Sequence, residues 1–356
     1  MLYFLLTTGK CNLKCKYCGG SFPEQLVPYS IKYSLKDLED FISQDEDATI
    51  AFYGGEPLLN ARFVKEVMER ISAKRFLIQT NGLLVEKLEL DYWLRMDTVL
   101  LSIDGRPNTT DYYRGRGVYR KVIEAAKALR EMGFEGELVA RMVLSSRSET
   151  YEDVTHLLSL GLFTHVHWQL DVIWSPRWNF EEWRDRDYKP ALKKLVDFWT
   201  GKLEQGEVLG IVPFLGLVSR MLFGSSRKPP CGAGSDAFAI LPNGKLLACP
   251  IAADAKWAYL GDLRSSSPQE LRDKVIIGEP CINCGFYEIC GGRCLYAYKE
   301  MLWGREGFEE VCDATKYLVK LLEEKLPAIK RLLEAGKLRR ADLVYPRYNN
   351  STEIVP

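Results

Sequence analysis

The sequence predicts an α/β protein in which a partial (β/α)6 barrel is followed by a small cysteine-rich domain. Strand-like and helix-like stretches alternate from residue 1 to about residue 173, which is typical of a parallel sheet with helical crossovers. Cysteine or polar motifs follow several of these strands, and seven of the ten cysteines come after residue 230. The loops that follow barrel strands meet at one face, so we expect these motifs to form one site.

Six strands and five helices account for the alternation. The apolar runs predict strands at residues 2–7, 49–53, 76–79, 98–103, 138–144 and 165–172. A capping-box pattern at Ser34 and Asp37 predicts a helix through about Ser43. Further helices are expected at residues 61–72, 85–94, 119–132 and 151–160, with Gly133 as a plausible C-cap.

Length and composition limit the class of protein. The 356 residues are enough for two domains, and 48 Lys and Arg residues balance 48 Asp and Glu residues. No net field therefore favours nucleic acid or an anionic membrane. The apolar start is too short for a signal peptide, and no later run approaches a membrane span. These features predict a cytoplasmic protein with reduced thiols, in which cysteines bind metal rather than form disulfides.

The chain divides into four predicted segments: the barrel at 1–175, a bridging aromatic-rich helical segment at 176–230, a cysteine-rich domain at 231–320, and a C-terminal helix and tail at 321–356. The aromatic residues either pack one domain against another or line a substrate; they are Trp168, Trp174, Trp178, Phe180, Trp183, Tyr188, Phe198 and Trp199. Helices are expected at residues 189–203 and 314–333, the second interrupted at Pro327, and the turn at Asn243-Gly244 predicts a hairpin. His156, His165 and His167 are expected to be structural.

Three cysteines follow the first strand with the spacing C-x3-C-x2-C: Cys11, Cys15 and Cys18. Three thiolates on one loop leave one metal position open, whereas a closed structural site uses four ligands. Thiolates favour zinc or iron–sulfur, and the spacing suits iron–sulfur better. With Tyr17 before the third cysteine, the loop resembles the cluster loop of radical S-adenosylmethionine (radical SAM) enzymes, whose fold is a TIM-like partial barrel.

Motifs after the later strands extend this resemblance. As dipeptides and turns, Gly54-Gly55 and Thr80-Asn81-Gly82 need no function. In their order they resemble radical SAM motifs that surround the cofactor, and the segment Asp111 to Gly117, which contains Arg114, resembles an Arg-Gly segment of peptide-modifying members. Arg141, a charge within an apolar strand, serves either the cofactor carboxylate or a buried salt bridge. The resemblance implies that cofactor contacts come from Gly54, Gly55, Glu56, Pro57, Thr80, Asn81, Ser102, Asp104, Arg141, Gln169 and Leu170.

In the last third, a C-x12-G-x4-C pattern runs from Cys231 to Cys249, C-x2-C-x5-C-x3-C runs from Cys281 to Cys294, and Cys312 follows. This order resembles that of a SPASM domain, which holds two auxiliary 4Fe-4S clusters in radical SAM enzymes that modify peptides. Zinc is the alternative for these cysteines taken alone. The resemblance implies one cluster on Cys281, Cys284, Cys290 and Cys312, and another on Cys231, Cys249 and Cys294. Three clusters then use all ten cysteines. The three-cysteine auxiliary cluster is expected to have an open iron or a ligand other than cysteine.

The resemblance implies that one electron cleaves S-adenosylmethionine to a 5′-deoxyadenosyl radical, which removes hydrogen from a peptide or protein substrate. Pro250 stands where sulfatase-maturing members are expected to have Asp, and no cysteine is spare for epimerisation. The expected outcome is therefore oxidative: a crosslink, thioether, desaturation or decarboxylation.

The expected partners are the substrate, an external one-electron donor such as flavodoxin or ferredoxin, and a separate leader-binding protein if the barrel or middle segment does not recognise the substrate. The alternatives are a small-molecule radical SAM dehydrogenase, and a non-catalytic iron–sulfur electron carrier or zinc-binding protein. The sequence names no catalytic acid or base.

Overall fold

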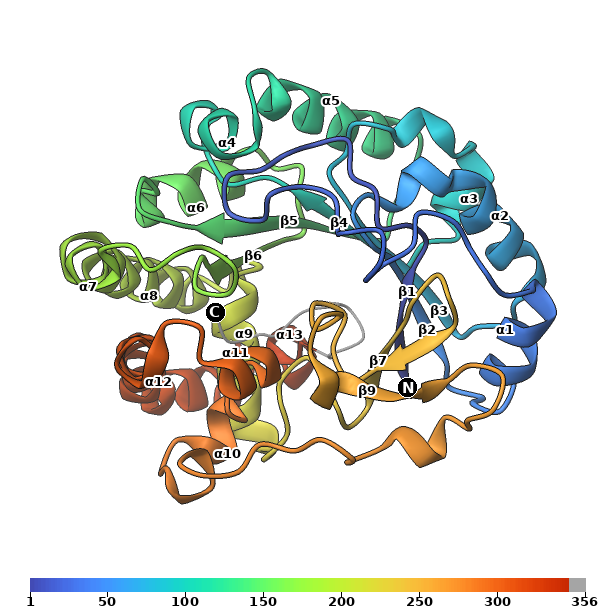
Figure 1. The fold of residues 1–356 in the computed structure, drawn as a ribbon. Helices are drawn as coiled ribbons and strands as arrows, with labels where there is room; N and C mark the ends of the chain where they lie inside the picture. The colour runs from blue at the N-terminus through green and yellow to red at the C-terminus, as the bar shows by residue number, and fades with distance from the viewer. Residues whose placement is uncertain (346–356) are drawn as a thin grey trace.

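The computed structural model describes residues 1–345 and builds them around a nine-stranded sheet (Figure 1). Six parallel strands pair in chain order, each lying within two residues of its predicted ends. They are β1 (Leu2–Leu6), β2 (Thr49–Tyr53), β3 (Arg75–Thr80), β4 (Thr98–Ser102), β5 (Glu137–Leu144) and β6 (His165–Leu170). The predicted α/β fold class and partial barrel are confirmed.

Helices on the outside of the curved sheet connect these strands (Figure 1). They are α1 (Leu35–Ile42), α2 (Ala61–Arg70), α3 (Leu90–Leu94), α4 (Pro107–Arg114), α5 (Val118–Glu131) and α6 (Thr150–Ser159), with the short turns η1 (Pro57–Asn60) and η2 (Val85–Lys87). The capping box at Ser34 is present. The helix predicted at residues 85–94 is instead split between η2 and α3, because Leu88 is extended. Helix α4 was not predicted, since its polar sequence lacks an apolar period.

The cysteine-rich segment continues the same sheet. Strand β7 (Ala237–Ile240) pairs in parallel with β1, beginning with Leu2 opposite Ala237. The predicted hairpin then joins β7 to β8 (Lys245–Leu247), and β9 (Tyr259–Asp262) forms the edge. Gly244 adopts φ +88° in the turn, as a tight hairpin turn requires. The auxiliary cysteines are thus fixed to the barrel through shared backbone hydrogen bonds.

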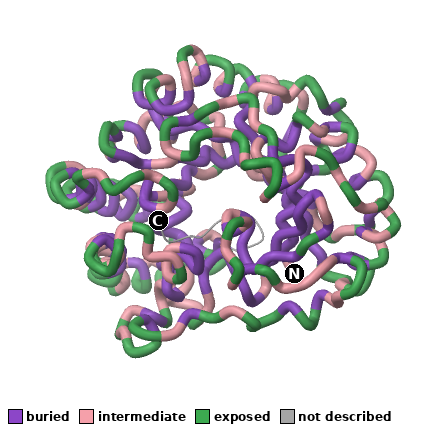
Figure 2. The backbone as a smooth tube through the Cα atoms, viewed as in Figure 1, coloured by how far each residue is buried: buried purple, intermediate pink, exposed green. Residues whose placement is uncertain are grey.

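Strand β1 is buried on both faces, which explains its continuous apolar sequence. Tyr3 and Leu5 belong to the core between the sheet and the outer helices. Leu2, Phe4 and Leu6 pack in a second core together with residues of the cysteine-rich segment. In Figure 2 the strands are buried, while exposed positions lie mainly on the outer helices and loops. The first strand therefore holds the barrel and the cysteine-rich segment together.

The remaining helices and turns follow β6 or lie within the cysteine-rich segment. The elements are α7 (Phe180–Trp183), the π-helical η3 (Arg184–Tyr188), α8 (Lys189–Glu204), α9 (Val212–Phe223), η4 (Lys256–Ala258), η5 (Gln269–Leu271), η6 (Cys281–Asn283), α10 (Tyr287–Cys290), α11 (Leu295–Glu300), α12 (Gly304–Glu334) and α13 (Arg340–Leu343). Helix α12 packs against α8 and α9. No helix within residues 1–345 is both long and apolar enough to cross a bilayer.

Helix α12 is longer than predicted and passes through Pro327 without a break. Pro327 and Glu323 are both exposed, so water can satisfy the carbonyl that lacks its helical N–H partner. The proposed boundary between residues 320 and 321 lies inside this helix. The tail from residue 346 to 356, predicted to be a solvated surface, lies outside the described residues.

The aromatic middle segment mainly packs. Trp183 stacks on Tyr188 at 5.2 Å, and Phe180 contacts Trp303 at the start of α12 at 5.9 Å. Trp174 differs because 39% of its surface is exposed. The packing interpretation holds for the buried rings, and Trp174 remains a candidate for the substrate wall.

Candidate functional site

A cavity of about 430 Å³ lies at the carboxyl ends of the barrel strands. Two sets of three cysteines line it: Cys11, Cys15 and Cys18 from the loop after β1, and Cys231, Cys249 and Cys294 from the cysteine-rich segment. We call it the shared cavity. The two incomplete ligand sets that the sequence assigns to different clusters thus face one space.

Backbone groups near the first cysteine loop support thiolate ligands. The Leu13 N–H donates to Cys11 Sγ at 3.4 Å, and the Cys18 N–H donates to the Cys15 carbonyl at 3.3 Å. A hydrogen bond from Cys15, accepted by Cys18, lowers the Cys18 pKa to about 6. The same bond, together with burial, raises the pKa of Cys15. One thiol of the loop is therefore already biased toward the thiolate that binds iron.

Gly54 and Gly55 bring the end of β2 directly against this loop. A Cβ on Gly54 would lie 2.3 Å from the Thr8 carbonyl oxygen, and one on Gly55 would lie 2.2 Å from the Lys10 carbonyl oxygen. The Gly55 N–H donates to Thr8 O at 3.1 Å, and the Glu56 N–H donates to Lys10 O at 2.8 Å. Gly54 also has φ +137°. Glycine is required here because the two backbones touch.

Glu56 is almost fully buried and joins two of the predicted motifs. Its carboxylate accepts hydrogen bonds from Thr80 Oγ1 at 2.7 Å, Asn81 N at 2.8 Å and Leu58 N at 3.0 Å. Burial raises the pKa of Glu56 to about 7, and these hydrogen bonds oppose that rise. Asn81 Nδ2 in turn donates to Asn12 Oδ1 at 2.7 Å. The motif after β3 is therefore tied to both the Gly-Gly-Glu segment and the cysteine loop.

Nine of the eleven predicted cofactor contacts line the shared cavity: Gly54, Gly55, Glu56, Thr80, Asn81, Ser102, Arg141, Gln169 and Leu170. Arg141 is 4% exposed, and its Nη1 donates to the Met142 carbonyl at 2.8 Å. Pro57 and Asp104 are not among the lining residues. Pro57 begins η1, and its carbonyl accepts from Thr7 Oγ1 at 3.1 Å. Asp104 is fully buried behind the wall, where it accepts hydrogen bonds from other side chains.

Several lining residues had not been selected from the sequence. They include Tyr53 and Phe22, and Phe22 meets Trp174, which the sequence did offer as a substrate-lining candidate, edge to face at 6.1 Å. Asp171, directly after β6, accepts a hydrogen bond from Ser145 Oγ at 2.7 Å and another from Ser175 Oγ. Burial raises the pKa of Asp171. Its position one residue beyond Leu170 is the only sequence feature that connects it with the site.

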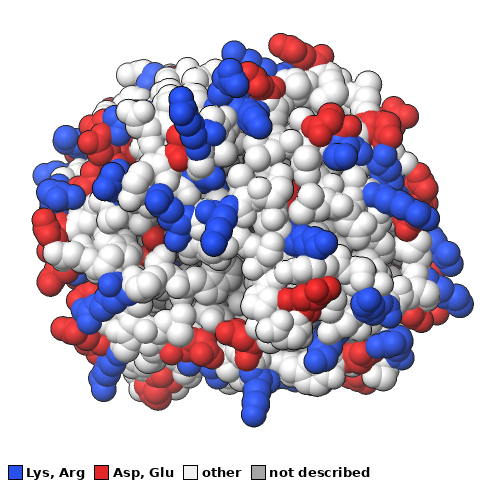
Figure 3. All heavy atoms as spheres, turned by 45° about the horizontal axis from the view of Figure 1, so that its top comes forward, with Lys and Arg blue, Asp and Glu red and all other residues white. Residues whose placement is uncertain are grey.

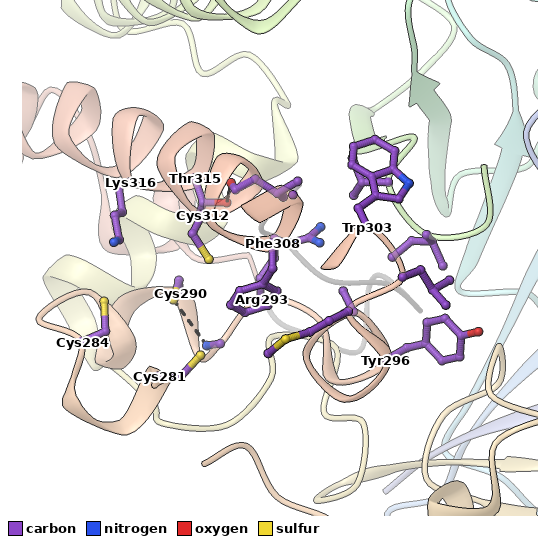
Figure 4. A pocket seen from close by; sticks show the side chains of 18 of the residues that line it. Cys281, Cys284, Cys290, Arg293, Tyr296, Trp303, Phe308, Cys312, Thr315 and Lys316 are labelled. Atoms are coloured by element: carbon purple, nitrogen blue, oxygen red, sulfur yellow. Dashed lines mark hydrogen bonds between the residues drawn. The ribbon is translucent and has the colours of Figure 1, made fainter. Parts of the chain in front are cut away.

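A second, much smaller cavity of about 60 Å³ contains the other four cysteines, Cys281, Cys284, Cys290 and Cys312. Figure 4 shows Cys312 extending from α12 toward the segment that carries Cys281 and Cys290. The Gly292 N–H donates to Cys290 Sγ at 3.3 Å. Burial raises the pKa values of Cys290 and Cys312, and raises that of Cys281 to about 12. The ten cysteines therefore divide between the two cavities as the predicted assignment requires.

The donor sets suit clusters better than single ions. Within residues 1–345, no three or more His, Cys, Asp and Glu side chains are close enough to hold one metal ion. A tetrahedral zinc site needs its sulfurs gathered about 2.3 Å from the ion, whereas a four-iron cluster accepts thiolates spread around its corners. The N–H···S hydrogen bonds at Cys11 and Cys290 also fit cluster ligands. The residues present fit iron–sulfur clusters.

The three histidines take structural places. His167 is fully buried on β6, His165 pairs with Glu137 at 2.5 Å, and His156 hydrogen-bonds Tyr119 at 2.8 Å. None of them lines either cavity. On the face shown in Figure 3, acidic and basic side chains are interspersed, in agreement with the balanced composition.

The model of the radical SAM superfamily matches residues 5–160. The cysteine-type anaerobic sulfatase-maturating enzyme of Clostridium perfringens (strain 13) is 24% identical over 323 residues, covering 80% of this chain and 85% of that protein. The mycofactocin maturase MftC of Mycobacterium tuberculosis is 25% identical over 323 residues, covering 82% and 77%.

Solved structures share the whole fold. Native anSMEcpe with bound AdoMet covers 94% of this chain and 100% of its own, with a TM-score of 0.73 and 20% identity. Streptococcus suis SuiB bound to precursor peptide SuiA covers 84% of this chain and 73% of its own, with a TM-score of 0.55 and 17% identity. Residues 5–160 contain the first cysteine loop and most of the motifs around the shared cavity, and this part of the chain matches the radical SAM superfamily.

Proposed function

We propose that this protein is a radical SAM enzyme that oxidatively modifies a peptide or protein. The observation that carries the proposal is the shared cavity, where two three-cysteine sets face one space of about 430 Å³. Bound to the first set, a 4Fe-4S cluster with S-adenosylmethionine would supply a 5′-deoxyadenosyl radical that removes hydrogen from an unactivated carbon. The protein's own task is then to bind and orient the cofactor and the substrate, and to exclude water from them.

The cofactor half of the cavity is formed by the strand ends. Gly54 and Gly55 keep the β2 backbone against the cysteine loop, where the methionyl group would be held. Arg141 offers a guanidinium for the cofactor carboxylate. Ser102, Gln169 and Leu170 line the wall on which the nucleoside would lie. These assignments follow from their common cavity and from the family motifs.

The other half of the cavity is mainly apolar, which suits a peptide side chain. Phe22, Tyr53 and Trp174 line it, and Asp171 and Asp254 add carboxylates that can accept a substrate proton. The relatives support this substrate class: the sulfatase-maturating enzyme and the mycofactocin maturase are named for maturation, and SuiB is seen with its precursor peptide. We infer the same class of substrate for this chain.

The absence of a fourth cysteine beside Cys231, Cys249 and Cys294 shapes the proposed chemistry. All other cysteines of the chain belong to the N-terminal loop or to the small cavity. The open position of this auxiliary set would face the space that the substrate occupies. A cluster on the four-cysteine set would accept the electron released when the substrate is oxidised. An external donor such as flavodoxin or ferredoxin would supply the initial electron.

The oxidative outcome follows from two sequence features. Pro250 follows Cys249 directly, and every cysteine already belongs to one of the three sets. A crosslink, thioether, desaturation or decarboxylation needs no hydrogen-donating thiol, whereas radical epimerisation does. Formylglycine formation is the less favoured outcome, because Pro250 follows Cys249 directly.

Mass spectrometry of a candidate peptide co-expressed with the enzyme tests the function. A crosslink, thioether or desaturation removes two hydrogen atoms from the peptide, and an oxidative decarboxylation removes carbon dioxide and two hydrogen atoms. The control is the Cys15→Ala variant, which lacks one ligand of the first set. Release of 5′-deoxyadenosine only with a small metabolite would favour the dehydrogenase alternative. Absence of 5′-deoxyadenosine from the reduced, reconstituted protein would favour the electron carrier or the zinc-binding protein.

A further inference from the structure

Arg114, the last residue of α4, is buried between the cysteine loop and the barrel strands. It is 8% exposed, yet its side chain lines the shared cavity. Its guanidinium forms a bidentate ion pair with Asp104, with Nε to Oδ2 and Nη2 to Oδ1 both at 2.8 Å. The fixed fork of arginine makes this geometry specific in a way that lysine cannot reproduce.

Asp104 is the centre of a completely satisfied network. Besides Arg114, its carboxylate accepts hydrogen bonds from Tyr17 Oη at 2.9 Å and from the Val143 N–H at 2.9 Å. It has no exposed surface. One carboxylate therefore joins the cysteine loop to the end of α4 and to β5.

The loop between Cys15 and Cys18 contacts both α4 and Asp104. Tyr17 places its ring 5.5 Å from the Arg114 guanidinium, in addition to its hydrogen bond with Asp104. The Lys16 N–H donates to the Tyr113 carbonyl at 2.9 Å. The ion pair thus lies directly behind the two residues that separate the second and third cysteines.

Stability alone is a weak reason for such a pair. A buried ion pair adds little compared with apolar residues of the same size, because both charges lose their hydration. Its orientation is more informative. Arg114 lines the shared cavity together with Cys15 and Cys18, whereas Asp104 does not. The positive end of the pair therefore faces the thiols.

We propose that Arg114 and Asp104 are positioning residues for the radical SAM cluster: through Tyr17 they fix the cysteine loop, and Arg114 holds a buried positive charge beside it. The fixed loop keeps the three thiolates in a constant position relative to Gly54 and Gly55. The charge stabilises the reduced cluster, which carries one more negative charge than the oxidised one. This inference rests on the match to the radical SAM superfamily and on the fit of the cysteines to a cluster, and is independent of the peptide substrate.

The test uses the reconstituted full-length protein, with the reduction potential of the S-adenosylmethionine-responsive cluster measured by electron paramagnetic resonance during a redox titration. In the double variant Arg114→Gln/Asp104→Asn, which leaves no unpaired buried charge, the ratio of reduced to oxidised cluster at a fixed potential should fall about threefold to tenfold. Tyr17→Phe keeps the charge, so it should keep the potential and alter the cofactor-induced change in the spectrum.

The matched control is Arg106→Gln. Arg106 pairs with Asp153 at 2.9 Å on the same rim of the barrel but does not line the shared cavity. This variant should leave potential and spectrum unchanged.

An unchanged potential in the double variant, at normal iron content, would overturn the role of the charge. An unchanged spectral response in Tyr17→Phe would overturn the positioning role. If the double variant fails to hold the cluster, the single variants Arg114→Lys and Arg114→Gln are compared instead. A higher reduction potential in Arg114→Lys than in Arg114→Gln supports the proposal. Equal potentials, or equal loss of the cluster, overturn it. If the potential and the spectrum change as predicted but no modified peptide is found, only the proposed function is contradicted.

Discussion

The two cysteine-lined cavities differ in size, lining and ligand number. The shared cavity, about 430 Å³, has two sets of three cysteines and polar groups from the strand ends. The small cavity, about 60 Å³, has four cysteines and a mostly apolar wall that includes Phe286, Trp303 and Phe308. The two sets of three cysteines thus line the larger space, and the set of four cysteines lines the smaller one. This difference supports our proposal that outside molecules bind in the first cavity and that the second holds a cluster for electron transfer.

The two cavities are also built differently. The shared cavity needs strands β1 to β6 and the β7–β8 hairpin, so its residues come from distant parts of the chain. Three of the cysteines in the small cavity lie within ten residues of one another, and only Cys312 comes from elsewhere, on α12. Damage to the barrel should therefore affect the first cavity much more than the second.

Loss of one cysteine from each cavity gives the largest contrast. Cys15→Ala should lower 5′-deoxyadenosine release at least ~1,000-fold, because the first set can no longer hold its cluster. Cys312→Ala should keep this release within about tenfold while lowering the yield of modified peptide. Chromatography with mass detection measures both products. Equal loss of 5′-deoxyadenosine in both variants would contradict the division of tasks.

A pair of glycine substitutions tests the dependence on backbone contact. Gly55→Ala places a Cβ 2.2 Å from the Lys10 carbonyl oxygen, so the cysteine loop must move. Gly285 lies between Cys284 and Cys290, and a Cβ there meets nothing within 4 Å. Gly55→Ala should weaken the binding of S-adenosylmethionine about 100-fold, and Gly285→Ala should leave it unchanged. The affinity for S-adenosylmethionine is measured by equilibrium binding to the two reconstituted variants. Equal affinities would contradict the close backbone contact at Gly55.

Removal of Trp174 tests the substrate half of the shared cavity. Trp174→Ala should raise the KM for the peptide about tenfold, since a large apolar contact is lost. It should leave substrate-independent cleavage of S-adenosylmethionine unchanged, because Trp174 packs on Phe22 and is not one of the predicted cofactor contacts. Trp178→Ala is the paired control, since that ring contacts Phe180 and Trp183 and does not line the cavity. An equal rise of KM in both variants would assign the effect to packing, and an unchanged KM in Trp174→Ala would contradict the substrate role.

The smallest effect concerns pH. Burial raises the pKa of Glu56 to about 7, above its ordinary value, so the folded protein holds a proton that the unfolded chain has released. The free energy of unfolding should therefore fall as pH rises toward 7 and level off above it, by about 1 kcal/mol between about pH 6 and pH 8. Denaturant unfolding of Glu56→Gln should lack this decline. The same slope in both proteins would assign the pH dependence to other groups.

The sequence predicted the barrel strands well because each is a short apolar run, and the first four are followed by a glycine-containing or cysteine-containing motif. Helix α4 was missed because its polar residues have no helical period, although it begins at Pro107. The pairing of β7 with β1 was also missed, since nothing local indicates which strand a distant hairpin joins. Local patterns therefore predict elements better than their partners.

The candidate site follows the same rule. Ligand cysteines and Gly54-Gly55 have recognisable spacing, and the structure places them on the cavities. Asp104 belongs to a recognisable motif but does not line the shared cavity. Its buried carboxylate forms an ion pair with Arg114 instead. Phe22 and Asp171 have no motif at all and reach the cavity only through the curvature of the sheet. Their selection requires the three-dimensional structure.

The central claim is that both three-cysteine sets, and not the four-cysteine set, leave an iron open toward the shared cavity. Mössbauer spectroscopy of the protein reconstituted with ⁵⁷Fe tests it, with S-adenosylmethionine and then cyanide added as probes. S-adenosylmethionine should shift one iron of the cluster on Cys11, Cys15 and Cys18. Cyanide should then shift one iron of the cluster on Cys231, Cys249 and Cys294, and this second shift should vanish in Cys249→Ala. A response of the Cys281, Cys284, Cys290 and Cys312 cluster instead, or no second shift, would contradict the claim.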